Sequence, residues 1–227
     1  MYKVDTHVHT SESSPCASIS GAEVARRYHK LGYTSFVVTD HIHESFFTRP
    51  STTKSAPTSD MWDAFVDEFL KGYNAAKIAG DKLGINVILG AEIRFKGINS
   101  DFLLYGLDED FLRKNKYLHE MCPTEFAAKF GNDLLIIQAH PFRDYNERKF
   151  IRIAHGIEVF NGHPRHNNHN DLARDYRDRN PTLYALCGSD AHDDGDEGRA
   201  VMYSTVPLKD SYGLKNALVS GNIALYP

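Results

Sequence analysis

Short apolar runs separated by amphipathic stretches recur along the whole chain. In the first run Val4 and Val8 face one way, and His7 and His9 face the other, because side chains alternate along a strand. Further strands are predicted at 36–39, 87–89, 102–105, 134–137, 157–160, 183–187 and 200–206. Helical spacing between most of these runs predicts alternating strands and helices, which favours a parallel sheet with right-handed crossovers.

Sequence signals at helix ends place the helices between these strands. Ser20 and Glu23 match a capping box, and Gly32 is a plausible stop for the helix that they start. A long helix is predicted from about Asp60 to Leu83, and shorter ones at 109–121, 123–131, 172–177 and 210–219. The polar segment 42–59 is too long for a simple connector, so we interpret it as a lid or substrate loop.

Residue types that commonly bind metal ions stand at or directly after the ends of most of the apolar runs. They are His7 and His9, Asp40 and His41, Glu92, His140, Glu158 and Asn161, and Asp190 and His192. In a barrel of parallel strands the C-terminal strand ends converge on one mouth, where catalytic groups gather. The chain is slightly short for an eight-unit barrel, and its strand count permits seven units.

Composition narrows the class of protein. The 227 residues predict a single domain spanning 1–227, with 41% hydrophobic and 25% charged residues. A net charge of −4 without a basic run argues against nucleic acid as a partner. No apolar stretch is long enough to span a membrane, and a strand beginning at residue 2 leaves no room for a signal peptide. Three cysteines without a C-x-x-C pair do not predict a disulfide framework, which favours a cytoplasmic location.

The mixture of imidazole and carboxylate groups predicts a metallohydrolase. Such ligands suit Zn, Mn or Fe, and the lack of a thiolate set argues against a structural zinc site. Phosphate monoesters hydrolyse so slowly that one general acid or base supplies only a small part of the required acceleration. Paired metal ions roughly 3.5–4 Å apart would position the substrate, stabilise charge and activate water.

Together these motifs resemble the PHP family, named for polymerase and histidinol phosphatase. The matching segments are His7-Val8-His9, Thr39-Asp40-His41, Gly90-Ala91-Glu92, His140-Pro141, 158–161 and Gly188-Ser189-Asp190-Ala191-His192. The resemblance implies a distorted seven-stranded (β/α)7 barrel that binds two or three divalent ions and hydrolyses phosphoesters with a metal-bound hydroxide. Carried over by motif, the metal ligands are His7, His9, His41, Glu92, His140, Asp190 and His192, with Glu92 as the bridging carboxylate.

Two departures from the family pattern leave a third metal ion less secure than the first two. Many relatives carry a ligating His or Asp where this chain has Pro15, so Glu12 or Cys16 would have to replace it. Relatives also often carry a histidine on the strand after the bridging glutamate, where this chain offers only Asp101 or Asp108. Further candidate ligands are Asp40, Glu158 and Asn161, and Asp5 is a candidate for orienting a ligand imidazole.

Arginines after the motifs are candidates for binding phosphate through forked hydrogen bonds. They are Arg143, Arg199 and Arg94, each of which is equally compatible with a solvated surface charge. Asp190, His192 and His163 are the expected catalytic residues. The other loop histidines, His43, His166 and His169, are interpreted as loop or helix-start residues.

The leading hypothesis is hydrolysis of a small phosphomonoester. Histidinol phosphate and phosphotyrosine are alternative substrates within the same chemistry. A non-catalytic metal-binding module of a larger assembly is an alternative of a different class, and a metal-dependent amidase is a further enzyme alternative.

Overall fold

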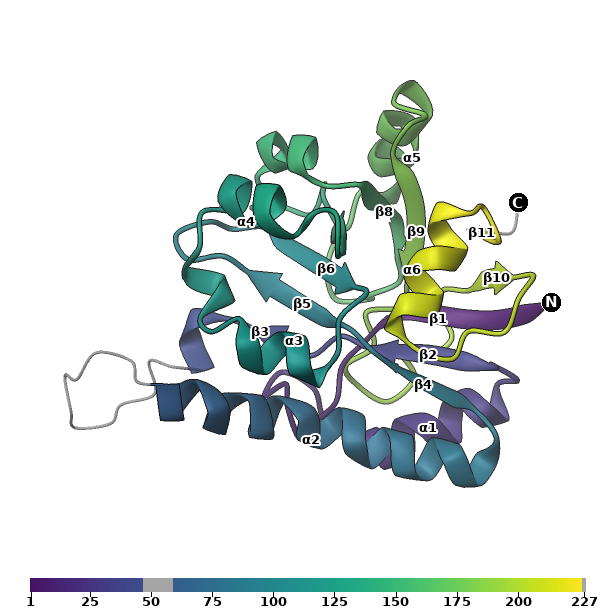
Figure 1. Ribbon diagram of the computed structural model, residues 1–227. Coiled ribbons are helices and arrows are strands. Elements are labelled where there is room, and N and C mark those ends of the chain that lie inside the picture. Colours follow the sequence, from purple (N-terminus) through teal and green to yellow (C-terminus); the bar gives the residue numbers. More distant parts are fainter. Residues whose placement is uncertain (47–58, 226–227) are drawn as a thin grey trace.

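The computed structural model describes residues 1–46 and 59–225 (Figure 1). Its strands occupy seven positions around a ring, two of them interrupted by a kink. In order they are β1 (Tyr2–Val8), β2 (Ser35–Val38) with β3 (His41–Ile42), β4 (Asn86–Leu89) with β5 (Ala91–Arg94), β6 (Asp101–Tyr105), β7 (Leu135–Gln138), β8 (Gly156–Asn161) and β9 (Tyr184–Gly188).

Hydrogen bonds at the strand ends join the two sheets into this ring. Val8 and Ala191 form a parallel bridge, and the Asp190 amide donates to the His7 carbonyl at 2.8 Å. On the other side of β1, strands β2 and β4 continue into β3 and β5. At this junction the Glu92 amide donates to the Asp40 carbonyl at 3.0 Å. The expected distorted (β/α)7 barrel is therefore confirmed.

The expectation of a parallel sheet throughout was wrong in two places. Strand β6 runs antiparallel to both β5 and β7, with Leu103 opposite Glu92 on one side and Ile137 on the other. The short 95–100 connection explains the first pairing, because a parallel neighbour would need a longer crossover. Strands β10 (Met202–Ser204) and β11 (Ile223–Leu225) extend the sheet beyond β1, also in antiparallel pairs.

Helices surround the strands. They are α1 (Gly21–Lys30), α2 (Ser59–Leu83), α3 (Glu109–Lys114), α4 (Pro123–Phe130), α5 (Asn170–Arg179) and α6 (Ser211–Val219), with short 3-10 turns η1 (Glu44–Phe46), η2 (Leu118–Glu120) and η3 (Arg148–Ile153). The predicted helix 109–121 ends early at Lys114, and its last part forms η2. Most of the predicted loop 42–59 lies outside the described residues, and its first part forms η1.

Helices α1 and α2 lie side by side beneath β1, β2 and β4 (Figure 1). Ser20 caps α1 by accepting a hydrogen bond from the Glu23 amide at 3.4 Å. Glycines allow α2 to approach the barrel closely: a Cβ atom on Gly72 would lie 1.7 Å from Thr10 Oγ1 and 3.0 Å from Asp40 Oδ2. This approach places the long helix directly behind the residues that follow β1 and β2.

Apolar residues fill the space between the strands and the helices. Trp62 on α2 is fully buried and donates its indole N–H to the Leu112 carbonyl at 2.8 Å. Phe65 and Phe69 on the same helix are buried, whereas Met61 is 40% exposed. Among the described residues, no helix is both long enough and apolar enough to cross a membrane.

Candidate metal centre

Strand β1 delivers two buried imidazoles to the mouth of the barrel. His7 and His9 are almost completely buried, and their Nε2 atoms lie 3.1 Å apart. His7 donates its Nδ1–H to Glu158 Oε1 at 2.9 Å, which leaves Nε2 as the ligand atom. Two nitrogens at about 2.0–2.1 Å from one tetrahedral ion stand about 3.3 Å apart. The observed separation therefore fits a shared cation.

Glu92 on β5 presents its two carboxylate oxygens to different imidazoles. Oε2 lies 3.4 Å from His7 Nε2, 3.3 Å from His9 Nε2 and 3.0 Å from His41 Nδ1. Oε1 lies 3.1 Å from His140 Nε2. A carboxylate placed in this way fits a bridge between two cations, as the sequence motif implied.

Asp190 lies opposite Glu92 at the end of β9. Its Oδ1 lies 3.4 Å from His7 Nε2 and 3.3 Å from His9 Nε2. Its carbonyl oxygen accepts the Nδ1–H of His192 at 2.9 Å, which leaves His192 Nε2 available as a ligand. Asp190 has φ 51° and His140 has φ 28°, left-handed values that cost non-glycine residues free energy and often occur at functional sites.

Among the described residues, four groups of three side chains could hold a metal ion, and three of these groups overlap. They are His7 with His9 and Asp190; His9 with His41 and His192; Glu92 with Asp101 and His140; and His163 with Asp190 and His192, each with ligand atoms within 4.8 Å of one another. These imidazole and carboxylate donors suit Zn, Mn or Fe. The structure thus brings together the side chains of all seven residues that the family motifs implied as candidate ligands.

The same groups perturb one another's ionisation strongly. Burial lowers the pKa of His7, but the carboxylates of Asp190, Glu158 and Glu92 outweigh it and hold that pKa well above its usual value. Burial raises the pKa of both Glu92 and Asp190, but nearby charged groups, His7 foremost, hold both pKa values well below the usual range. The cluster therefore favours ionised carboxylates with a positive charge between them, which protons or metal ions can supply.

Several candidate ligands make hydrogen bonds that hold neighbouring parts of the cluster in place. Glu158 holds His7 through Oε1, and its Oε2 accepts the His140 amide at 2.8 Å and the Asn161 side-chain amide at 3.0 Å. Asp40 accepts hydrogen bonds from the Thr10 amide at 2.8 Å and from the Thr10 hydroxyl at 2.6 Å. These contacts fix the rings and loops that carry the ligand atoms.

Two other candidate ligands, Glu12 and Asp108, are not among the described groups that could hold a metal ion. Glu12 accepts the Gly21 amide with both oxygens, at 2.9 and 3.2 Å, at the start of α1. Asp108 caps α3 by accepting the Phe111 amide at 2.8 Å. Local helix capping therefore explains both carboxylates. Cys16 lines the cavity at the mouth, beside His41.

Asp5 supports β1 from the far side of the strand. Its carboxylate accepts hydrogen bonds from the Ser189 amide at 3.0 Å, the Tyr28 hydroxyl at 2.8 Å and the His7 amide at 3.1 Å. Burial is the main reason that the pKa of Asp5 rises to about 7. Asp5 therefore joins β1 to β9 at the point where both strands deliver ligands.

A cavity of about 320 Å³ opens over the metal-binding groups. It is lined by Cys16, His41, Glu92, Arg94, Asp101, His140, Arg143, His163, Arg165, His166, Asp190 and His192. His163 donates its Nδ1–H to the Asp190 carbonyl at 3.0 Å, and burial lowers its pKa. His166, interpreted as a loop residue, stacks on His163 with ring centres 5.0 Å apart.

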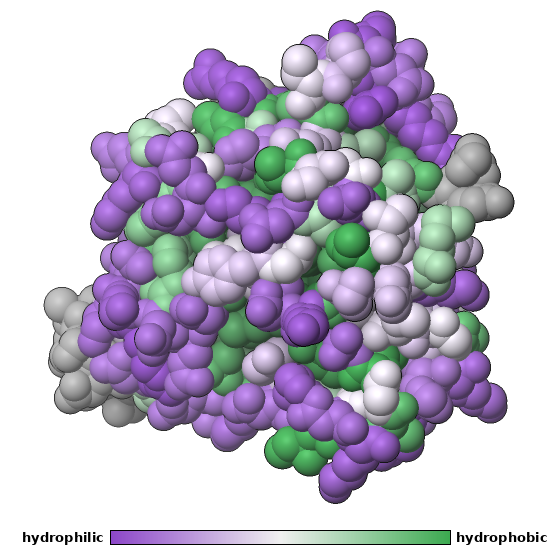
Figure 2. All heavy atoms as spheres, turned by 45° about the vertical axis from the view of Figure 1, so that its right-hand side comes forward, coloured by the Kyte–Doolittle hydropathy of each residue, from purple (hydrophilic) through white to green (hydrophobic). Residues whose placement is uncertain are grey.

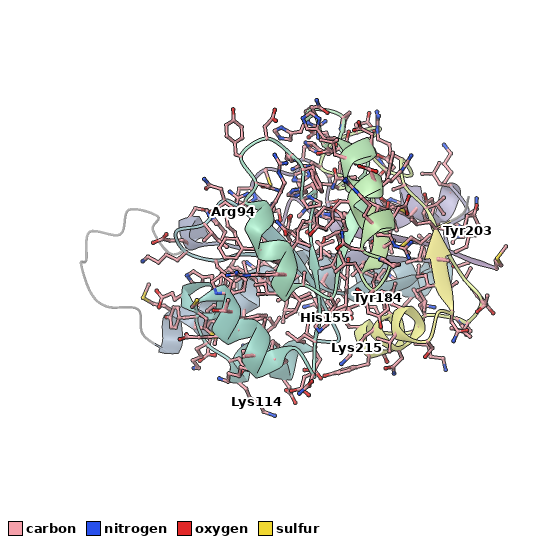
Figure 3. All side chains as sticks on the ribbon, turned by 90° about the horizontal axis from the view of Figure 1, so that it is seen from above. Arg94, Lys114, His155, Tyr184, Tyr203 and Lys215 are labelled. Atoms are coloured by element: carbon pink, nitrogen blue, oxygen red, sulfur yellow. The ribbon has the colours of Figure 1, made fainter. Side chains whose placement is uncertain are left out.

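The three candidate phosphate-binding arginines have different surroundings. Arg143 donates from Nη2 to Asp190 Oδ2 at 2.7 Å and from Nε to Asn168 at 2.7 Å. Arg94 directs both arms of its guanidinium to Asp101, each at 2.6 Å, and lies apart from the Lys215 side of the molecule (Figure 3). Arg199 does not reach the cavity: its Nε donates to the Gly195 carbonyl, and the side chain lines a separate cavity.

Sequence reasoning missed Arg165, which lines the mouth. Its guanidinium pairs with Asp196, whose Oδ2 also accepts the amides of His192 and Asp193. The loop after β8 and the loop after β9 are thereby joined beside the ligand His192. No motif marked Arg165, because the contact depends on two loops that are distant in sequence.

Comparisons with known proteins agree with this geometry. A family model described as PHP domain matches residues 5–203. No curated protein matches the chain. Among solved structures, one similar protein is a two-domain protein of Bacteroides vulgatus that contains a predicted PHP-like metal-dependent phosphoesterase, with 19% identity and a TM-score of 0.68. The match covers 99% of this chain but 64% of the Bacteroides chain, so this chain spans less than two thirds of that protein.

Two further structures match over nearly their whole length. One, from Bifidobacterium adolescentis, is described as a candidate metal-dependent phosphoesterase; its identity is 13%, its TM-score 0.55, and the match covers 95% of each chain. The other is an amidohydrolase of Chromobacterium violaceum with bound sulfate, at 16% identity and a TM-score of 0.56, covering 98% of this chain and 97% of that one. At these identities the structural likeness shows the fold alone.

Proposed function

This chain belongs to the PHP domain family, and from that premise we propose that it hydrolyses a small phosphomonoester with divalent metal ions bound at the barrel mouth. The observation that carries the proposal is the arrangement of Glu92, whose two oxygens face His41 and His140 on either side. A binuclear hydrolase requires a carboxylate that bridges its two cations, whereas a single structural ion does not require one.

The donor set assigns the metal ligands. His7, His9 and Asp190 would hold one ion, and Glu92 would join it to a second ion held with His140 and Asp101. His41 and His192 would complete a third position with His9. Divalent ions bound there would stabilise phosphate charge and lower the pKa of a bound water towards neutrality.

Arg143 is the residue best placed to bind a phosphate group of the substrate. Its side chain is only 16% exposed, and it lines the cavity beside Asp190. The hydrogen bonds to Asp190, Asn161 and Asn168 use Nε and Nη2, and Nη1 takes part in none of them. A planar guanidinium fixed on one side can donate to phosphate oxygens from the other.

His163 would act on the substrate side of the cluster. Because the Asp190 carbonyl can only accept, the neutral His163 ring carries its proton on Nδ1 and has an unprotonated Nε2. Burial lowers the pKa of His163 and so favours this neutral form at pH 7. In the proposed reaction, Nε2 accepts a hydrogen bond or a proton from a group bound in the cavity.

The test combines metal analysis with a phosphate-release screen. The metal-loaded protein is assayed against phosphomonoesters that include histidinol phosphate and a phosphotyrosyl peptide, against phosphodiesters and against amides. We expect phosphate release from a monoester, loss of that activity with a chelator, and recovery with Zn, Mn or Fe. Turnover of amides alone would favour the amidohydrolase chemistry of the Chromobacterium neighbour, and no turnover would favour a non-catalytic metal-binding module.

A further inference from the structure

A second cavity, of about 490 Å³, lies on the outside of the barrel beside α5. Its lining comes from α5, β8, β9, β11 and the segment after the last metal motif: Val159, Phe160, Arg174, Arg177, Asp178, Ala185, Cys187, Arg199, Ala200, Val201 and Leu225. It shares no lining residue with the cavity over the metal centre. Val159 packs in one hydrophobic cluster with Ala173 of α5, which places it on the outer face of β8.

Three arginines surround this cavity, opposed by one carboxylate. Arg177 Nη1 lies 3.7 Å from Asp178 Oδ1, and Arg177 Nε is a buried donor without a hydrogen-bond partner in the described part of the chain. Arg199 donates a hydrogen bond from Nε to the Gly195 carbonyl. Because this carbonyl is neutral, the contact does not balance the positive charge of the Arg199 guanidinium. The rim of the cavity is therefore positive, and it contains a buried N–H group that an added acceptor would satisfy.

The floor of the cavity is apolar. Val159, Ala185, Val201 and Leu225 line it, and the guanidinium of Arg174 lies 5.5 Å from the centre of the Phe160 ring. This side of the molecule carries hydrophobic patches between polar side chains (Figure 2). A positive rim over an apolar floor is complementary to a molecule with an anionic head and a hydrocarbon body.

A neighbouring cavity extends the apolar surface. It has a volume of about 450 Å³, shares Arg177, Ala185 and Leu225 with the first, and continues past Tyr184 to Leu218 on α6. Tyr184 lies between α5 and α6 (Figure 3). Arg177 thus stands where the two cavities meet, with room for an elongated apolar group on either side of it.

We propose that the cavity between α5, β9 and β11 is a second binding site, separate from the metal centre, for a small organic anion that carries a hydrocarbon chain. The anionic group lies against Arg177 and Arg174, and the chain lies along Ala185, Val201 and Leu225. This proposal does not depend on the reaction at the barrel mouth.

Calorimetric titration with three probes tests the chemistry of the ligand. Hexanoate has both features, acetate has the charge without the chain, and hexylammonium has the chain with the opposite charge. We expect one hexanoate to bind per chain, with acetate and hexylammonium at least about tenfold weaker. Equal binding of hexanoate and hexylammonium, or no binding of hexanoate, would overturn the proposal.

Variants locate the site. Replacing both Arg174 and Arg177 with Gln should weaken hexanoate binding at least about tenfold, whereas Arg148→Gln, in η3 outside the cavity, should leave it unchanged. Ala185→Leu fills the floor without changing charge and should also weaken binding. Circular dichroism and thermal unfolding verify that each variant folds.

Binding at the metal centre is the competing outcome. Glu92→Gln should leave hexanoate affinity unchanged, because Glu92 lines only the other cavity. If Glu92→Gln removes hexanoate binding while the Arg174 and Arg177 variant retains it, the anion binds at the barrel mouth and the second site does not exist.

Discussion

The guanidinium of Arg143 holds the outer oxygen of the ligand Asp190, at 2.7 Å between Nη2 and Oδ2. The inner oxygen, Oδ1, faces Nε2 of His7 at 3.4 Å and of His9 at 3.3 Å. One carboxylate therefore connects the residue expected to bind phosphate with the residues expected to bind metal. Because Arg143 contacts Oδ2 and not the oxygen that faces His7 and His9, replacing Arg143 tests substrate binding separately from metal binding.

Arg143→Ala should lower kcat/KM for a phosphomonoester at least about tenfold, because a charge-assisted contact contributes about 1.5–3 kcal/mol. Arg143→Lys should recover little, since an ammonium cannot reach Asp190, Asn161 and phosphate together. Metal content measured by mass spectrometry should stay at the wild-type value. Arg148→Ala serves as the control, and full activity of both Arg143 variants would exclude a role in phosphate binding.

Glu92→Gln should remove at least one metal ion per chain and lower turnover at least about 100-fold. The glutamine side chain keeps the shape of the glutamate but lacks the negative charge that would hold two cations close together. Metal stoichiometry and phosphate release are measured on the same preparation. Glu12→Gln is the matched control, because Glu12 caps α1 and does not contact the centre. Unchanged stoichiometry in Glu92→Gln would refute the bridging role.

The metal-free protein should lose stability as pH rises above about 6.5. The folded-state pKa values of His7 and His41 lie well above their usual value. Burial lowers both, but it is outweighed at His7 by the carboxylates of Asp190, Glu158 and Glu92 and at His41 by Glu92 and Cys16. Groups with raised pKa values stabilise the fold fully below the unfolded pKa, and they lose that contribution as pH rises through the folded pKa.

Bound metal ions should remove this dependence, since cations then replace the protons between the carboxylates. Thermal midpoints are compared at pH 6, 7, 8 and 9, with chelator and with added Mn or Zn. The midpoint should fall across this range with chelator and should be higher with metal, most of all at pH 8. A chelator midpoint that is flat or rises from pH 6 to 9 would contradict the assignment.

Gly72→Ala should destabilise the protein by about 1–3 kcal/mol, because the added methyl overlaps Thr10 Oγ1 and pushes α2 away from the strand ends. Denaturant unfolding measures the loss. Gly213→Ala is the matched control: its Cβ atom would meet only Asp210 Oδ1, at 3.3 Å, within a helix. Equal stability of the two variants would show that the close approach at Gly72 is not required.

The sequence by itself predicted the strands, most helices and a set of candidate ligands. Alternation in β1 places His7 and His9 on one face, and the other candidate ligands follow apolar runs, so local patterns together with the family motifs were sufficient to single them out. The capping motif at Ser20 was equally local. The seven strand positions follow from the order of these elements along the chain.

Only the tertiary structure decided how each polar side chain is used. Glu12 and Asp108 look like ligands in sequence, but Glu12 accepts the amide of Gly21, nine residues further along the chain, and Asp108 caps the helix that directly follows it. Arg199 follows a metal motif yet lies on the outer face, whereas Arg165 reaches the mouth through Asp196. Antiparallel β6 depends on pairings across the sheet. Apart from the two contacts at helix starts, these outcomes rest on contacts between segments that are distant in sequence, whose geometry no local spacing specifies.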